Sequence, residues 1–258
     1  MGMLFDHGLD ATSSIVVMYQ IGRVHNCGGG FDLLLFMYLS SVSFYYFTLT
    51  EYYMGKMILP MFSGPDDTSV GISLVCFTTA YLGPAYWAET TNFADFLGFE
   101  NLKRKSILLY SLACFQLPFA ACATITNLNR ASKSETFEKR YKPFSFFLHV
   151  SYEIVLALTY IAYTQFTGST VLVDYPKLTT MAYGGQFLKA TLLIMVSSAA
   201  HQDFNPYSRT MLLCFLLLAI NATYLIGGRQ VIDEFWLMTA ICVISWGAVI
   251  HFVYHVMS

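Results

Sequence analysis

The sequence predicts an all-α fold, a polytopic membrane helical bundle of about eight transmembrane helices. Of the 258 residues, 56% are hydrophobic and only 12% are charged, whereas about a quarter of the residues in soluble domains are charged. The hydrophobic residues form runs of roughly 20, the length that an α-helix needs to cross about 30 Å of hydrocarbon. The chain is therefore expected to be an integral, multi-pass membrane protein.

The hydrophobic runs follow one another with short connections that are polar or contain Pro and Gly. The first run ends at residues 26–30, because the three successive glycines of that stretch are poorly suited to a helix interior. The expected spans cover residues 4–22, 31–52, 69–87, 106–128, 144–166, 178–200, 207–226 and 234–256.

An even number of spans places both termini on one side of the membrane. The most basic connection, from Arg130 to Lys142, lies on that side. The positive-inside rule therefore favours a cytosolic location for the termini.

Charge and cysteine content narrow the class of protein further. The net charge is −2 without a block of like charges, so no nucleic-acid partner is indicated. The six cysteines lack paired spacing and most lie in apolar runs, which argues against a disulfide framework. No internal repeat or change in composition divides the chain, so we expect a single membrane domain over residues 1–258.

Two carboxylates four residues apart open the first span. On a helix, Gly2, Asp6 and Asp10 lie on one face at successive turns, and the glycine leaves room beside the acids. Paired carboxylates suit a hard cation such as Mg²⁺, which keeps part of its coordination shell for substrate phosphates. The alternative is that the acids complement the dipole of the helix N-terminus.

A few other polar residues interrupt the apolar runs. Glu51 ends the second span on the same side as Asp6 and Asp10, so it either lines the same cavity or lies among lipid headgroups. Lys189 is expected to have a structural role, and His251 and His255 to lie together at the interface. The aromatic residues at 44–47 and 52–53 are expected to form an interfacial belt.

The first residues resemble the second half of the CDP-alcohol phosphotransferase signature, D-x-x-D-G-x-x-A-R followed by G-x-x-x-D-x-x-x-D. Gly2, Asp6 and Asp10 occupy the second half, and His7 follows the first of these acids as in eukaryotic members. Further stretches resemble the ethanolamine and choline (aminoalcohol) phosphotransferases of this family: residues 47–60 (FTLTEYYMGKMILP), 63–65 (SGP), 231–236 (VIDEFW) and 250–252 (IHF).

This resemblance implies transfer of phosphoethanolamine or phosphocholine from CDP-ethanolamine or CDP-choline to diacylglycerol, with release of CMP, in phospholipid biosynthesis. It implies Mg²⁺ or Mn²⁺ as cofactor, Asp6 and Asp10 as metal ligands, and Asp10 as the general base, buried near the membrane interface. Gly2, His7 and Glu51 are the candidates for substrate binding. The family also implies contact with membrane lipid in the endoplasmic reticulum or Golgi, and leaves a homodimer open.

The chain begins inside this signature, so we expect the D-x-x-D-G-x-x-A-R half and about two helices to be missing. Residues 1–128 would then be the remainder of the catalytic core, and residues 129–258 the C-terminal helices. Because half of a two-metal site would be absent, little activity is expected from the chain alone.

Two alternatives remain from the sequence. One is a transporter or channel in which Asp6, Asp10 and Glu51 form an intramembrane ion site. The other is a non-catalytic remnant of the family that still inserts into membranes.

Overall fold

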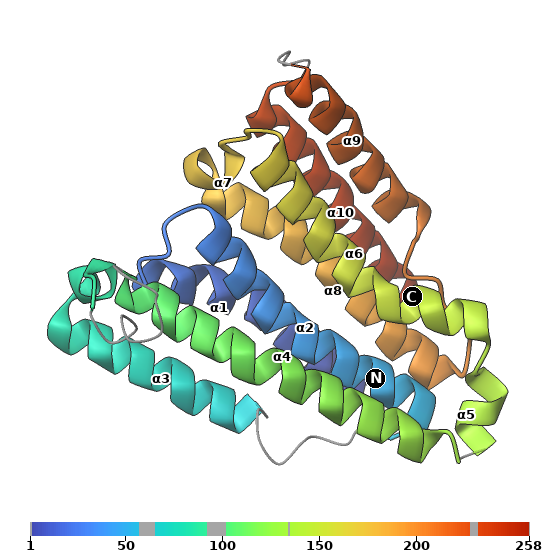
Figure 1. Cartoon of the computed structure of the whole chain (residues 1–258). Helices are drawn as coiled ribbons and strands as arrows, with labels where there is room; N and C mark the ends of the chain where they lie inside the picture. Colours follow the sequence, from blue (N-terminus) through green and yellow to red (C-terminus); the bar gives the residue numbers. More distant parts are fainter. Residues whose placement is uncertain (1, 57–64, 92–101, 134, 228–231, 258) are drawn as a thin grey trace.

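The computed structural model describes residues 2–56, 65–91, 102–133, 135–227 and 232–257 (Figure 1). Within these ranges the chain forms helices and turns, with one isolated β-bridge between Thr90 and Lys103. The predicted all-α class is therefore confirmed. The helices are α1 (Gly2–Val24), α2 (Phe31–Met54), α3 (Pro65–Leu82), η1 (Pro84–Ala88), α4 (Arg104–Ala131), α5 (Glu135–Arg140), α6 (Pro143–Phe166), α7 (Val171–Asp174), α8 (Pro176–Ala200), α9 (Arg209–Ile226) and α10 (Glu234–Met257).

Each predicted span overlaps one of the long helices in the described part of the chain. Four of these helices, α2, α4, α6 and α10, are long and apolar enough to cross a membrane by length and composition, and α3 and α9 contain shorter apolar stretches. The third span was predicted to reach Trp87, but α3 ends at Leu82. It ends there because Gly83 has a φ of 81°, outside the helical region, and Pro84 follows it.

Helices α2 and α8 form the centre of the bundle. Helix α2 packs on α1, α4, α6 and α8, while α8 also packs on α1 and α10 (Figure 1). Both termini lie at the end of the bundle where α5 is found (Figure 1). The number of membrane crossings stays a prediction.

The contacts of α8 depend on two adjacent glycines. A Cβ atom on Gly184 would lie 2.5 Å from Cγ2 of Ile15 on α1, and one on Gly185 would lie 2.5 Å from Oγ of Ser245 on α10. Real Cβ atoms do not approach other atoms so closely. The absence of side chains at these positions therefore lets α1 and α10 pack closely against α8.

The expected division of the single domain at residue 128 stays a prediction. Helices on either side of it pack on one another, as α8 does on both α1 and α2. All six cysteines are free thiols, as the scattered spacing suggested.

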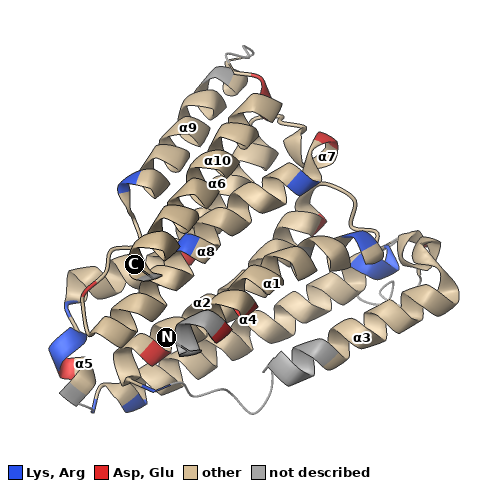
Figure 2. Ribbon diagram, turned by 180° about the vertical axis from the view of Figure 1, so that it is seen from behind, with Lys and Arg blue, Asp and Glu red and all other residues tan. Residues whose placement is uncertain are grey.

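Most charged residues lie near the ends of the helices, as Figure 2 shows. At the end opposite the termini, the ammonium of Lys105 lies 3.1 Å from a carboxylate oxygen of Asp32 and donates to the carbonyls of Asn26 and Cys27. His25 is buried beside this ion pair, and its ring meets Trp87 edge to face at 4.3 Å between centroids. Neither ring nitrogen of His25 has a hydrogen-bond partner among the described residues.

This environment favours the neutral form of His25. Burial lowers its pKa to about 4, with a further lowering from the positive charge of Lys105 and an opposing effect from Asp32. In an unfolded chain the pKa of histidine is about 6.5. The contribution of neutral His25 to stability is thus fully present above about pH 6.5 and is lost as the pH falls towards 4.

Between neutral pH and about pH 4, we expect the free energy of unfolding of the parent chain to fall by about 3 kcal/mol more than that of His25→Phe. This difference corresponds to the shift in the pKa of His25. Phenylalanine keeps the edge-to-face contact with Trp87 but does not titrate. The measurement is the unfolding temperature in detergent between pH 7.5 and 4.5 for the parent chain and the variant. Parallel curves for the two proteins would contradict this role of His25.

Candidate functional site

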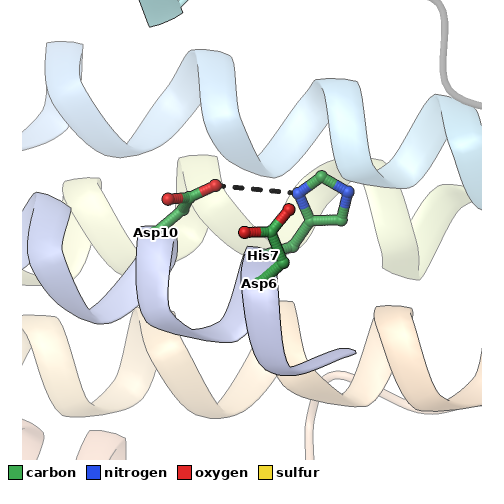
Figure 3. A group of neighbouring side chains, drawn as sticks. All are labelled: Asp6, His7 and Asp10. Atoms are coloured by element: carbon green, nitrogen blue, oxygen red, sulfur yellow. Dashed lines mark ion pairs between the residues drawn. The ribbon is translucent and has the colours of Figure 1, made fainter. Parts of the chain in front are cut away.

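The predicted acidic face of α1 is present in the structure. Three residues, Asp6, His7 and Asp10, each offer one possible ligand atom, and these atoms lie within 4.8 Å of one another. Nδ1 of His7 is 3.8 Å from Oδ2 of Asp10, and the three side chains lie together on one side of α1 (Figure 3). Gly2 lies in the same helix, one turn before Asp6. The four-residue spacing thus brings the acids together, as helical geometry requires.

The expected burial of Asp10 is wrong. Its side chain is 61% exposed, whereas that of His7 is 24% exposed. Asp10 lies near the first turns of α1, where the neighbouring helices do not cover it. An ion or a substrate phosphate can therefore reach Asp10 from outside the bundle.

Glu51 lies close to this group. It is buried in the last turn of α2, with 7% of its surface exposed, and it interacts electrostatically with His7. Its burial argues against a position among lipid headgroups, while a shared cavity with the acids of α1 stays a prediction. His7 thus interacts with two carboxylates, Asp10 on its own helix at 3.8 Å and Glu51 on α2 through an electrostatic interaction.

The donor set fits a divalent cation. Asp6 and Asp10 offer carboxylate oxygens, the ligands that Mg²⁺ and Mn²⁺ prefer, and His7 offers an imidazole nitrogen. Three protein groups leave room in a six-coordinate shell for water and substrate phosphates. Elsewhere in the described residues, no comparable group of three ligands is found.

The last turn of α2 has its final carbonyls paired. Gly55, with a φ of 71°, donates its N–H to the carbonyl of Glu51 at 2.8 Å. The guanidinium of Arg140 donates to the carbonyl of Tyr52. The hydroxyl of Tyr53 lies 2.7 Å from Nδ1 of His149 on α6. Glu51 is therefore carried by a turn of α2 that Gly55 caps and that α5 and α6 contact.

Residues 44–47 and 52–53 were expected to form an interfacial aromatic belt. This prediction is wrong for Tyr45, Tyr52 and Tyr53. At most 1% of the surface of each is exposed. They pack in the protein core, where Tyr45 stacks on Tyr152 of α6. Within the stretch that resembles the family motif, residues 47–53 are all buried, whereas residues 57–60, 63–64 and 231 lie outside the described residues.

The remaining candidates have structural positions. Lys189 is buried on α8, with its ammonium 3.6 Å from the ring centroid of Phe252 on α10, a cation–π contact. Nε2 atoms of His251 and His255 are 3.1 Å apart, which confirms that these side chains share one face of α10. None of these three residues is in the group on α1.

Sequence reasoning missed Glu153. This fully buried residue of α6 accepts hydrogen bonds from the hydroxyls of Ser41 on α2 and Tyr183 on α8, the latter at 2.8 Å. An acid in the middle of a predicted span was a signal of such a contact. Glu153 joins three helices at the centre of the bundle and is separate from the group on α1.

Comparison with known proteins shows which proteins this chain is similar to. No protein-family model matches the chain. Choline/ethanolaminephosphotransferase 1 of Arabidopsis thaliana is 25% identical over 265 residues, which cover 98% of this chain and 66% of the plant protein. An uncharacterized CDP-alcohol phosphatidyltransferase class-I family protein of Schizosaccharomyces pombe is 23% identical over 100% of this chain and 66% of its own length.

Ethanolaminephosphotransferase 1 of Mus musculus is 29% identical over 76% of this chain and 48% of the mouse protein. The chain thus spans just under two thirds of the length of the plant and yeast relatives. The similarity to the plant protein extends over 98% of the chain and therefore over nearly all of its helices. The chain is therefore similar, over nearly its whole length, to choline/ethanolaminephosphotransferases and to a CDP-alcohol phosphatidyltransferase class-I family protein.

Proposed function

We propose that the protein takes part in the transfer of phosphoethanolamine or phosphocholine from a CDP-alcohol to diacylglycerol. The observation that carries the proposal is the group of Asp6, His7 and Asp10, with Glu51 beside it, in a chain related to phosphotransferases that use these substrates. The hydroxyl oxygen of diacylglycerol forms a bond to the phosphorus that carries the alcohol. The bond from that phosphorus to the oxygen of CMP breaks, and CMP leaves.

The residues of α1 have separate roles in this proposal. Asp6 and Asp10 would hold the cation, and Asp10 would also accept the proton of the diacylglycerol hydroxyl. His7 and Glu51, with Gly2 one turn away, line the position of the substrate phosphates. When bound, Mg²⁺ or Mn²⁺ supplies positive charge that offsets the charge of the two phosphates.

The proposal includes three further statements. The termini face the cytosol, where the soluble CDP-alcohol is available, while diacylglycerol reaches the site from the membrane. The membrane is that of the endoplasmic reticulum or Golgi. The protein forms a homodimer, which the mass of the detergent-solubilised chain tests directly.

The test of this function is release of CMP. The chain alone, and the chain joined to the third of the plant relative that it does not match, are expressed in membranes of cells that lack this activity. We expect the joined form to release CMP from CDP-ethanolamine or CDP-choline in the presence of diacylglycerol and Mg²⁺ or Mn²⁺. The chain alone is expected to insert into membranes and release little.

Inserted protein that releases no CMP in either form would contradict the proposal. Ion flux into proteoliposomes would then distinguish the two alternatives. Flux that disappears in a variant without Asp6 and Asp10 would indicate a transporter or channel. Absence of both activities would indicate a non-catalytic member of the family.

A further inference from the structure

Arg140 is a buried cation at the end of the short helix α5, which lies at the same end of the bundle as the termini (Figure 1). Its guanidinium donates to the carbonyl of Tyr52 on α2 and, at 3.2 Å, to the carbonyl of Ser198 on α8. The same group lies 2.7 Å from Nδ1 of His201 and 4.6 Å from the ring centroid of Tyr52. Among the described residues, its hydrogen-bond partners are carbonyls and a ring nitrogen rather than a carboxylate.

These partners lie at the C-terminal ends of two long helices. The last carbonyls of a helix have no partner within it, and the helix dipole places partial negative charge there. Arg140 satisfies one such carbonyl on α2 and one on α8, and its positive charge lies between both ends. The planar guanidinium has several N–H donors in fixed directions, so it can bind carbonyls of two helices at once more readily than a lysine ammonium can.

His201 completes the connection on the α8 side. It caps α8 with a φ of 53°, and its backbone N–H donates to the last turn of the helix. Because the guanidinium can only donate, Nδ1 of His201 is the acceptor in this contact. Arg140 therefore contacts both the last turn of α8 and the residue that ends it.

The two helices that Arg140 joins also determine the geometry of the site. Helix α2 carries Glu51, one residue before the carbonyl that Arg140 holds. Helix α8 supports α1, where a Cβ on Gly8 would lie 3.2 Å from Cδ2 of Leu192. The separation of the ends of α2 and α8 thus affects the distance from Glu51 to His7 and Asp10.

We infer that Arg140 is a positioning residue for the proposed phosphotransfer, because it holds Glu51 of α2 at a set distance from the acids of α1. The inference rests on the proposed function. It assigns to α5 a role in catalysis, although no residue of α5 belongs to the group of possible ligands.

The first test compares the turnover of two charge-neutralising variants of α5, in whichever form of the protein releases CMP. Because Arg140 acts through Glu51, Arg140→Gln is expected to lower kcat by up to as much as Glu51→Gln does, with little change in KM for the CDP-alcohol. Lys139→Gln removes the same charge at the adjacent, exposed position and should leave kcat unchanged. Arg140→Lys keeps the charge but loses the planar guanidinium, so an intermediate kcat is expected.

A double variant distinguishes positioning from a general loss of structure. If Arg140 acts through Glu51, Arg140→Gln should lower kcat much less in a Glu51→Gln background than in the parent protein. Losses that multiply in the double variant would mean that Arg140 acts by another route, and the inference would be wrong.

A distance measurement tests the inference without any turnover. Spin labels are placed at Lys56, just after α2, and at Ala200, the last residue of α8, in the full chain with its native cysteines replaced. Both positions are exposed. Arg140→Gln should broaden the distance distribution between the labels, and Lys139→Gln should not. An unchanged distribution in Arg140→Gln would overturn the inference even if CMP release is observed, whereas a broadened one without CMP release would count against the proposed function alone.

Discussion

Replacement of Asp10 with Asn is expected to lower turnover by about 10²–10⁴-fold, the usual loss when a general base is removed. The amide has nearly the same shape as the carboxylate, so binding of the CDP-alcohol should be almost intact. The measurement is the rate of CMP release together with direct nucleotide binding, in detergent or nanodiscs.

Asp174→Asn is the matched control, because it removes an exposed carboxylate from α7, at the opposite end of the bundle. If Asp10→Asn turned over at the parent rate, Asp6 and Asp10 would be no more than a favourable charge at a helix N-terminus, and the proposed chemistry would be wrong. Loss of turnover in His7→Gln but not in Asp10→Asn would instead make His7 the proton acceptor, with Glu51 as its partner.

Replacement of Asp6 with Asn should raise the concentration of Mg²⁺ or Mn²⁺ needed for half-maximal turnover. A neutral amide is a poorer ligand for a hard cation than a carboxylate. Changes in the outer shell of metal sites already cost 10–100-fold in affinity, so a loss of at least about tenfold is expected here. Turnover at saturating metal should recover much of the parent rate.

The same titration on the other acids checks the assignment of roles. Glu51→Gln should have a milder effect than either change on α1, because Glu51 interacts with His7 electrostatically and is not in the group of possible ligands. If Asp10→Asn weakened metal affinity and Asp6→Asn did not, the roles of the two acids would be reversed.

The sequence was sufficient to predict the long helices and the group on α1, for local reasons. Runs of about 20 apolar residues determine where helices form, and a spacing of three or four residues determines which side chains meet on one helix. Asp6, His7 and Asp10 therefore lie together whatever the rest of the chain does. The proximity of Glu51 followed from counting spans, since that count puts the end of α2 on the side of the termini.

The rest depends on contacts that hydropathy does not encode. An apolar run shows that a helix lies in the membrane, but not which of its sides faces lipid and which faces protein. Tyr45, Tyr52 and Tyr53 were for this reason expected at the interface and are found in the core. The partners of Arg140 lie 88 and 58 residues away along the chain, so no local pattern predicts them.

The close packing at Gly184 should make this position sensitive to mutation. A larger residue there would push Ile15 and the whole of α1 away from α8, and the acids of α1 would move with it. In a saturation mutagenesis screen scored by phospholipid synthesis, Gly184 is thus expected to rank with Asp6 and Asp10. A position with no functional group would then be as intolerant of substitution as the acids that carry the chemistry.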